Sequence, residues 1–178
     1  MKLSGSSDIK IVQLPSEFYD SRPKQVAVDT IIIHSIYNPE IEDCFSVRDC
    51  KALLDKYEVS AHYLIDRTGI IYQLVADESR AWHAGASKMP NSQDGREGVN
   101  AFSLGIELIG SESSNFTADQ YQAIAALAKR LIALHPIQNI YGHKDIAPDR
   151  KSDPWEFDWE RFKSDLKEIK SFESINFP

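Results

Sequence analysis

The chain has 178 residues, of which 42% are hydrophobic and 26% charged, and its formal net charge is -7. This length and composition predict one soluble domain with its own core. The negative charge argues against nucleic acid or an anionic membrane as a partner, and no apolar run approaches the ~20 residues that span a bilayer. The opening MKLSGSSDIK holds no apolar secretory segment. We therefore expect a cytoplasmic protein, or a periplasmic one if the chain is a trimmed mature form.

In the first half of the chain, a strand is followed by a helix and a hairpin. Residues 29–36, DTIIIHSI, are β-branched and mostly apolar, which is typical of a buried strand. Residues 46–57 carry an apolar stripe at helical spacing, and Ser46 is a candidate N-cap. Residues 60–66 and 70–75 are separated by a short turn that ends in Gly, which predicts a hairpin.

In the second half, we expect two strands, two helices and one long loop. Residues 84–100 are rich in Gly, Ser and Asn, and loops of this length are often functional. Residues 117–136 give the clearest helix pattern, with Thr117 and Gln120 as a capping box. The other elements are strands at 102–110 and 139–142 and an amphipathic helix from Asp158. The interleaved strands and helices predict a single α/β domain over residues 1–178, with a central mixed sheet flanked by helices.

Two histidines and an aspartate are candidate metal ligands. His34 and His143 lie at or near the ends of predicted strands, and Asp153 precedes a proline. Two imidazoles and a carboxylate would make a three-ligand zinc site with a fourth position open to water. Asp145 is a rival ligand, because a strand would place it on the same face as His143. The residue pattern alone leaves Asp145 and Asp153 as alternatives.

Glu107 and Lys151 are candidates for catalysis. Glu107 lies in FSLGIELIG among apolar and small residues, where a carboxylate is costly unless it is paired or used in function. A structural salt bridge is the alternative for Glu107. Lys151 is two positions before Asp153 and would, by itself, be read as a solvated loop cation.

The combination of motifs resembles a known family. The segments IIIHSI, SAHYLIDRTGIIYQLV, AWHAGAS, NAFSLGIELIG and YGHKDIAPDRKSDP occur in this order, and the set resembles the zinc N-acetylmuramoyl-L-alanine amidases of the amidase-2 family, which are related to peptidoglycan recognition proteins. The resemblance covers roughly residues 28–163. It is greatest to the cytoplasmic branch that acts on 1,6-anhydro muropeptides in peptidoglycan recycling.

This resemblance implies a function and a site. It implies hydrolysis of the amide bond between the lactyl group of (1,6-anhydro-)N-acetylmuramic acid and the L-alanine of the stem peptide. It implies a Zn2+ cofactor held by His34, His143 and Asp153, which favours Asp153 over Asp145. The catalytic pair that it implies is Glu107 and Lys151, and the expected partner is a muropeptide. We expect a monomer.

The sequence also departs from the family in the implied site. Ala61 stands where the phage and recognition-protein branch has a Tyr that assists catalysis, so Glu107 must supply that function. Ser35 follows the first ligand, whereas the recycling enzymes typically have Asn after this His. Trp155 follows Asp-Pro, where they typically have Gly. These changes predict altered hydrogen bonds around His34 and a reshaped pocket rim.

Four further residues are candidate substrate contacts. Arg96 and Arg150 would bind carboxylates of the stem peptide or sugar, and Trp82 and His83 would line the pocket. Two other functions stay open on the sequence alone. One is an amidase acting on intact peptidoglycan, of periplasmic or phage type, and the other is a non-catalytic muropeptide-binding module.

Overall fold

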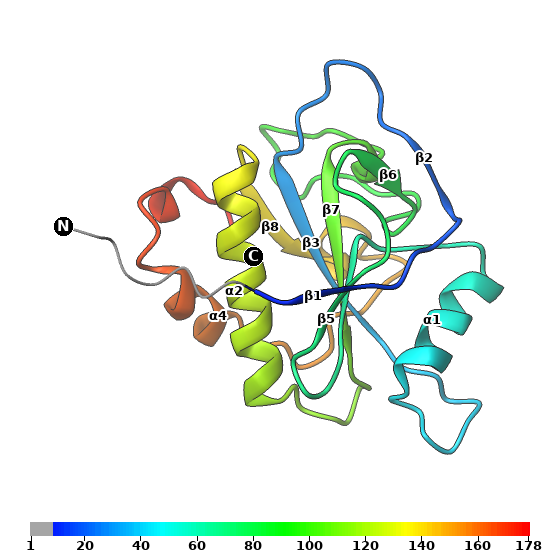
Figure 1. Ribbon diagram of the computed structural model, residues 1–178. Helices are drawn as coiled ribbons and strands as arrows, with labels where there is room; N and C mark the ends of the chain where they lie inside the picture. The colour runs from blue at the N-terminus through cyan, green and yellow to red at the C-terminus, as the bar shows by residue number, and fades with distance from the viewer. Residues whose placement is uncertain (1–8) are drawn as a thin grey trace.

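The structure is a computed structural model that describes residues 9–178. The opening MKLSGSSD, in which we expect no secretory signal, lies outside the described residues. Six strands form one sheet in the order β1, β5, β4, β7, β3, β8 (Figure 1). Their bounds are Ile11–Gln13 for β1, Thr30–Ile36 for β3, Tyr63–Ile65 for β4, Ile71–Gln73 for β5, Ser103–Ile109 for β7 and Asn139–Gly142 for β8.

The sheet is mixed, as the sequence predicted. β4 and β5 are antiparallel and form the expected hairpin, whereas β1 with β5, β4 with β7, β7 with β3, and β3 with β8 are parallel. All seven residues of β3 and all seven of β7 are buried. Strands covered on both faces need near-continuous apolar sequence, so a His on β3 and a Glu on β7 are exceptions that require a reason.

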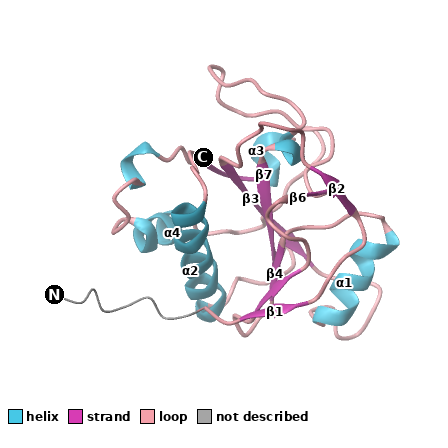
Figure 2. Ribbon diagram, turned by 45° about the horizontal axis from the view of Figure 1, so that its top comes forward, coloured by secondary structure: helices cyan, strands magenta, loops and turns pink. Residues whose placement is uncertain are grey.

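Helices cover both faces of the sheet. α2 (Ala118–Leu134) and α4 (Trp159–Leu166) lie on one side, and α1 (Val47–Lys56) lies on the other (Figures 1 and 2). The expected caps are present. Thr117 and Gln120 form the capping box of α2, Ser46 caps α1, and the Asp158 side chain accepts a hydrogen bond from the Arg161 N–H at the start of α4.

The face of the sheet opposite α2 carries two separate apolar clusters. Ile32, His34 and Ile36 alternate onto this face because successive strand residues point to opposite sides. Ile36 belongs to the cluster that packs with α1, and Ile32 belongs to one that packs with the 84–100 loop. His34 therefore lies between two hydrophobic clusters, where a polar site is shielded on both flanks.

Short elements complete the fold and were mostly not anticipated. β2 (Tyr19–Ser21) and β6 (Ser79–Ala81) form a separate antiparallel pair, and there are two short 3-10 helices, η1 (Val99–Ala101) and η2 (Phe172–Ser174). Segments of three residues are too short for periodicity to reveal them. No helix within residues 9–178 combines the length and the hydrophobicity needed to cross a lipid bilayer.

One local prediction is wrong. The possibility that Asp145 shares a ligand face with His143 assumed that both lie on a strand. Instead, β8 ends at Gly142, and His143–Ile146 form the short helix α3. The Asp145 carboxylate turns back and accepts a hydrogen bond from the Gly142 N–H at 2.7 Å, which caps α3 rather than facing a metal.

Candidate metal centre and active site

The register of the two central strands places His34 beside Glu107. These residues are direct partners in the parallel pairing of β3 with β7, so their side chains leave the sheet on the same face. His34 is 1% exposed and Glu107 is 8% exposed. The strand register alone therefore brings a buried imidazole and a buried carboxylate together.

His143 reaches the same place because β8 is short. Its last residue, Gly142, pairs with Ile33, so His143 follows at the level of His34. The two imidazole centroids are 4.4 Å apart. The carboxyl ends of parallel strands are a frequent location for binding sites in open sheets, and here both histidines lie at that edge.

Asp153 is held against this pair by contacts on both sides. The Lys144 N–H donates to the Asp153 carbonyl oxygen at 2.8 Å, and the Ser35 N–H donates to Asp153 Oδ2 at 3.4 Å. Pro154 packs so closely on Gly142 that a Cβ there would lie 2.6 Å from Pro154 Cδ. The glycine before His143 is thus required for the loop to return to β8.

The three predicted ligands meet in space. His34 Nδ1 is 3.5 Å from Asp153 Oδ2, and His143 Nδ1 is 3.2 Å from Asp153 Oδ1. One ligand atom from each of His34, His143 and Asp153 lies within 4.8 Å of the others. Zinc bonds of about 2.0–2.3 Å in a tetrahedral arrangement require ligand atoms roughly 3.3–3.6 Å apart. The contacts with Asp153 match that spacing.

The hydrogen bonds of His143 leave a lone pair, rather than a proton, facing Asp153. His143 Nε2 is 3.4 Å from the Ala84 carbonyl oxygen, which can only accept, so the ring proton belongs on Nε2 and Nδ1 presents a lone pair to Asp153. Burial tends to raise the pKa of Asp153, but its contacts with His143 and His34 outweigh this and hold that pKa well below its usual range. A carboxylate facing an imidazole lone pair is repulsive unless a cation lies between them, so the donor set fits a metal ion.

Burial also keeps His34 neutral. It lowers the pKa of His34 to about 4, with His143 adding to the effect and Asp153 opposing it. Only the neutral imidazole can coordinate a metal. The surroundings of His34 thus favour the form that a metal needs.

Glu107 has the properties expected of an acid-base group. Within residues 9–178, its Oε2 is one of two buried side-chain polar atoms without a hydrogen-bond partner, the other being Trp159 Nε1. Burial raises the pKa of the Glu107 carboxyl well above its usual value, the charge of Asp153 raises it further, and Lys151 opposes the shift. The structure gives Glu107 no salt-bridge partner in the described chain. The alternative of a structural ion pair is therefore wrong.

Lys151 lies on the exposed side of the same site. Its backbone N–H donates to Ala147 at 3.0 Å, and its side chain is exposed. Its charge acts on both Glu107 and His34, lowering the pKa of each. The Lys151 cation is therefore coupled electrostatically to a candidate ligand and to the candidate acid-base group.

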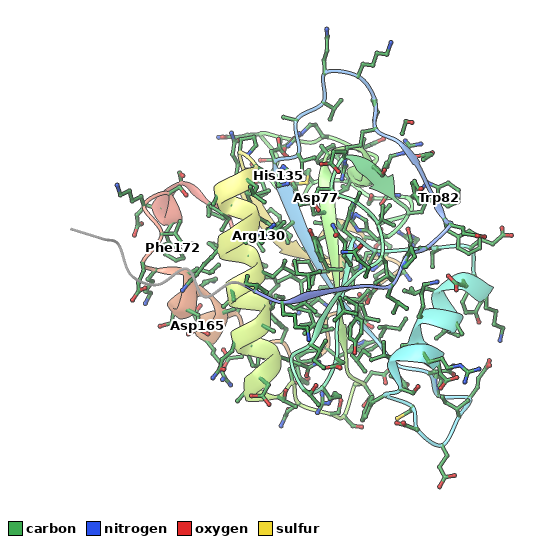
Figure 3. The ribbon with its side chains drawn as sticks, in the orientation of Figure 1. Asp77, Trp82, Arg130, His135, Asp165 and Phe172 are labelled. Atoms are coloured by element: carbon green, nitrogen blue, oxygen red, sulfur yellow. The ribbon has the colours of Figure 1, made fainter. Side chains whose placement is uncertain are left out.

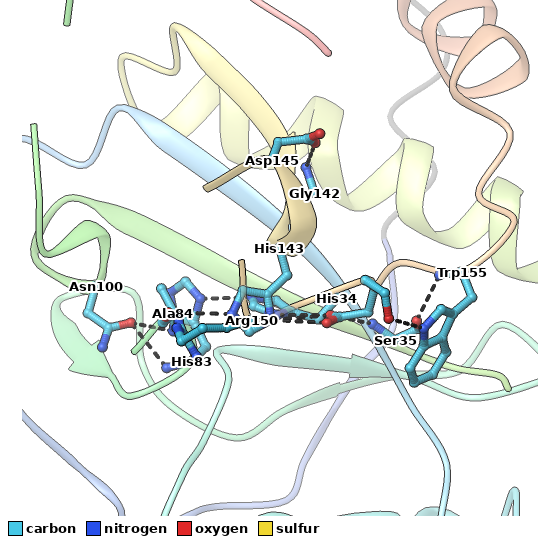
Figure 4. A network of polar contacts seen from close by, with 12 residues as sticks. His34, Ser35, His83, Ala84, Asn100, Gly142, His143, Asp145, Arg150 and Trp155 are labelled. Atoms are coloured by element: carbon cyan, nitrogen blue, oxygen red, sulfur yellow. Dashed lines mark hydrogen bonds and ion pairs between the residues drawn. The ribbon is translucent and has the colours of Figure 1, made fainter. Parts of the chain in front are cut away.

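His83 is deeper than the sequence suggested. It was expected on a pocket wall, but it is 8% exposed, and its Nδ1 is 2.9 Å from His34 Nε2 (Figure 4). Its neighbour Trp82 is half-buried and lies beside β2 at the edge of the view (Figure 3). Of these two adjacent residues, only His83 contacts a candidate ligand.

The two arginines differ in their partners. Arg96 forms an ion pair with Asp29 at 2.9 Å and another with Asp94 at 2.6 Å, so a substrate carboxylate would have to compete with both. Arg150 is exposed, and within residues 9–178 it bonds backbone oxygens alone, donating to Ala84 at 3.1 Å and Ala86 at 2.6 Å. Arg150 has no carboxylate partner among the described residues and shares the Ala84 carbonyl with His143.

A cavity of about 600 Å³ adjoins Arg150. It lies between the 84–100 loop and the segment that follows α3, and residues 86–90 and 145–150 line most of it. This is large enough for part of a small ligand. The predicted functional loop therefore forms one wall of this cavity, whereas the candidate metal ligands do not line it.

Two of the residues that depart from the family, Ser35 and Trp155, contact each other. The Trp155 N–H donates to Ser35 Oγ at 3.2 Å (Figure 4), and the Trp155 ring meets Tyr37 edge to face with the ring centroids 5.8 Å apart. Ser35 also binds Asp153 through its backbone. The substitutions thus form one contact that joins the strand bearing His34 to the loop bearing Asp153.

Sequence reasoning missed the residues that support the histidines. Asn100 Oδ1 accepts hydrogen bonds from the backbone N–H groups of His83 at 3.1 Å and Ala84 at 2.8 Å. Arg22 donates to backbone oxygens of residues 77, 100, 101 and 103, and burial lowers its pKa to about 10. Neither role leaves a sequence signal, because the partners are backbone atoms of distant segments.

Comparison with known proteins agrees with this geometry. A family described as N-acetylmuramoyl-L-alanine amidase matches residues 24–156. The 1,6-anhydro-N-acetylmuramyl-L-alanine amidase AmpD of Escherichia coli (strain K12) is 40% identical over 167 residues, which cover 85% of this chain and 89% of that relative.

Two solved structures share the fold. A crystal structure of a selenomethionine AmpD derivative has a TM-score of 0.77 and 40% identity, and the match covers 88% of this chain and 94% of that one. The E. coli amidase AmiD, solved with the substrate anhydro-N-acetylmuramic acid-L-Ala-D-gamma-Glu-L-Lys, has a TM-score of 0.67 and 31% identity over 81% of this chain and 60% of its own. The predicted amidase-type fold with a central mixed sheet is confirmed.

Proposed function

Because the chain belongs to the N-acetylmuramoyl-L-alanine amidase family, we propose that its substrate is a 1,6-anhydro muropeptide. It hydrolyses the amide bond between the lactyl group of the muramic acid and the L-alanine of the stem peptide. The relative that is 40% identical is named for this anhydro substrate, and AmiD was solved with an anhydromuramyl tripeptide. The proposed role is therefore peptidoglycan recycling.

The observation that carries this function is the position of Glu107 beside a cage of metal-ligating atoms. The cage consists of His34, His143 and Asp153, and the unpartnered Oε2 of Glu107 is buried beside it. An amide is hydrolysed only if a water is activated and the leaving nitrogen is protonated. A non-catalytic muropeptide-binding module does not require a buried acid-base carboxylate of this kind.

We propose zinc as the metal, held by His34, His143 and Asp153. Two imidazoles and a carboxylate leave an open position in a tetrahedral site, as catalytic zinc requires. When bound, zinc supplies Lewis-acid polarisation of the substrate carbonyl and lowers the pKa of a water molecule to about 7. Everything else in the reaction is done by side chains of this chain.

Glu107 is the general base and then the general acid. Its carboxylate takes a proton from the attacking water, and it delivers that proton to the L-alanine nitrogen as the amide bond breaks. Its buried position favours proton transfer because a carboxyl shielded from water holds its proton closer to neutral pH than an exposed one. General acid-base catalysis by one such group contributes about 10²–10⁴-fold.

Lys151 stabilises the negative charge that develops on the carbonyl oxygen. Its side chain is exposed, and its charge acts on Glu107 by opposing the rise of the Glu107 pKa. A donor aimed at such an oxyanion contributes about 10²–10³-fold.

Arg150 binds a carboxylate of the stem peptide. Its guanidinium contacts two backbone oxygens, and Arg150 is one of the residues that line the 600 Å³ cavity. These contacts leave donors for a substrate carboxylate. Trp82 and Arg96 remain weaker candidates because one lies near β2 and the other is already paired. We further propose that the enzyme acts as a monomer in the cytoplasm, which size-exclusion chromatography and cell fractionation would test.

Product analysis by mass spectrometry tests the function. The purified protein is incubated with an anhydromuramyl tripeptide, with a zinc chelator, and with chelator followed by added zinc. Free tripeptide should appear, disappear with chelator and return with zinc. Intact substrate in the zinc-loaded sample would overturn the proposal.

A second comparison separates the two amidase substrates. Rates are measured on the same tripeptide and on intact cell-wall sacculi. The recycling role requires a clear preference for the anhydro muropeptide, whereas equal or faster release from sacculi would identify an enzyme of intact peptidoglycan.

A further inference from the structure

His83 occupies a slot that the fold makes for its ring. It follows β6, and Asn100 fixes its backbone through hydrogen bonds to residues 83 and 84. The ring lies against Gly105 of β7, where a Cβ would come within 2.5 Å of His83 Cγ. A side chain at position 105 would therefore expel the imidazole, so the glycine of the strand and the ring of His83 are matched.

The hydrogen bonds around His83 fix the location of its proton. Ser103 Oγ donates to the Val99 carbonyl oxygen at 2.7 Å, which uses its only proton. Its contact with His83 Nε2 at 3.1 Å can then exist only if Ser103 Oγ accepts, so the His83 proton is on Nε2. A neutral imidazole protonated at Nε2 has a lone pair on Nδ1.

This lone pair determines the proton position on His34. His83 Nδ1 is 2.9 Å from His34 Nε2, and a lone pair there must receive a proton from its partner. His34 is therefore protonated on Nε2, and its Nδ1, which faces Asp153 at 3.5 Å, keeps the lone pair. Hydrogen bonds thus run in one direction, from His34 through His83 and Ser103 to the backbone of Val99.

We propose that His83 is a positioning residue that holds His34 in the tautomer and ring orientation that metal binding through Nδ1 requires. This rests on the proposed zinc site, but it assigns His83 a role different from substrate contact. Both ring nitrogens of His83 are already bonded and the ring is buried, so it offers no group to a muropeptide.

The next histidine along the sheet does not share this role. His62 is fully buried, and its Nδ1 accepts from the Gly105 N–H at 3.0 Å. Its ring meets His83 edge to face with centroids 5.7 Å apart, and no hydrogen bond joins the two within the described residues. The positioning contact therefore ends at His83, and His62 supports the glycine that gives the ring its space.

Zinc affinity of matched variants tests the inference. In His83→Asn, the amide oxygen replaces the Nδ1 acceptor, whereas His83→Leu has nearly the same shape and no acceptor. Loss of an outer hydrogen-bond partner typically weakens metal binding 10–100-fold, so we expect this loss in His83→Leu and most of the affinity to be retained in His83→Asn. The measurement is competition with a chromophoric chelator. His135→Gln, at the end of α2 and paired with Asp77, is the control and should bind zinc as the wild type does.

Nitrogen NMR of the metal-free protein tests the same contact without zinc or activity. The His34 Nε2–H signal should be protected from exchange in the wild type and in His83→Asn, and should exchange rapidly in His83→Leu. Thermal melts of the metal-free variants show whether each is folded. Should His83→Leu not fold, a His34 proton on Nδ1 in the wild type would still overturn the inference.

The outcomes separate this inference from the proposed function. A wild type that binds no zinc contradicts the proposed metal site, whatever the state of His34. A wild type that binds zinc, with equal affinities in His83→Leu and His83→Asn, overturns only the role of His83. Weakened zinc binding in His83→Leu, together with a near-normal zinc affinity in His83→Asn, supports the role of His83.

Discussion

The proposed active site has two halves that are built differently. The half on the sheet consists of His34 and Glu107, which are strand partners in β3 and β7, with His83 behind them. The loop half follows β8 and consists of His143, which begins α3, and of Lys151 and Asp153 in the loop that follows α3. Strand register places the first half, whereas the second depends on a few hydrogen bonds and on the packing of Pro154 against Gly142. The sheet half thus sets the proton position on His34, and the loop half supplies the charges of Asp153 and Lys151.

Replacing Glu107 should have the largest effect. Glu107→Gln keeps the shape of the side chain but removes the acid-base group, so we expect kcat to fall about 10²–10⁴-fold. Zinc content should be unchanged, because Glu107 is not among the three candidate ligands. Turnover is followed by mass analysis of the released peptide.

Glu160→Gln is the matched control for this prediction. Glu160 is exposed in the first turn of α4, and its loss should leave kcat within about twofold of the wild type, as for ordinary surface substitutions. Near-normal turnover in Glu107→Gln would remove Glu107 from the mechanism and leave the sheet half without a catalytic group.

Replacing Lys151 should have the next largest effect. Lys151→Ala removes the cation of the loop half and should lower kcat about 10²–10³-fold, because the developing oxyanion loses a donor. Lys151→Arg should recover part of this loss. Lys144→Ala, an exposed lysine of the same segment, should have little effect on the rate. Equal rates for Lys151→Ala and Lys144→Ala would show that the loop supplies only metal ligands.

The stability of the metal-free protein should depend on pH through the sheet half. Burial lowers the pKa of His34 to about 4 and that of His62 to about 3, and it places the pKa of His83 well below its usual value. In the folded protein these histidines stay neutral, whereas in the unfolded chain they take up protons below about pH 6.5. Their contribution to the free energy of unfolding is therefore fully present above pH 6.5 and is lost as the pH falls toward 4 and 3. Glu107 has a raised pKa, so its contribution to the free energy of unfolding increases as the pH falls. Three imidazoles act against this one carboxyl, and we expect the net effect to be a loss of stability.

Denaturant titrations at pH 7, 6 and 5 measure this dependence, with the free energy of unfolding expected to decrease at each step. His34→Asn should make the free energy of unfolding depend less steeply on pH, by the equivalent of about one proton bound on unfolding. A free energy that rises as the pH falls would mean that Glu107 outweighs the histidines.

The smallest predicted effect concerns the contact between the two halves. Ser35→Ala removes the acceptor of the Trp155 N–H, and loss of one such hydrogen bond should lower the free energy of unfolding by about 1 kcal/mol. Zinc affinity should fall slightly, since Asp153 is next to this contact. Ser92→Ala in the exposed 84–100 loop is the control. No difference between the two variants would show that the halves are joined without Ser35.

Much of the fold was predictable because its signals are local. The apolar run before His34, the capping box at Thr117 and the turn between β4 and β5 each lie within one element. The strand at 139–142 was predicted with its correct bounds, but the four-residue helix α3 that follows was not anticipated, and the Asp145 alternative assumed a strand there. The residue pattern alone therefore left Asp145 as a rival ligand, and the resemblance favoured Asp153. The structure agrees with the resemblance, because the Asp145 carboxylate accepts a hydrogen bond from the Gly142 N–H.

By itself, the sequence determined which chemical groups were available and which family resemblance they carry. The resemblance implied His34, His143 and Asp153 as ligands and Glu107 and Lys151 as the catalytic pair. Residue physics alone marked Glu107 as a carboxylate that is costly in apolar surroundings unless it is paired or used. Only the tertiary structure decided how these groups are arranged: that Glu107 is unpaired, that Arg96 is paired, and that His83 bonds His34. The reason is physical, since propensity and periodicity act over a few neighbouring residues, whereas the proton on His34 depends on Ser103, which is 69 positions away in the numbering.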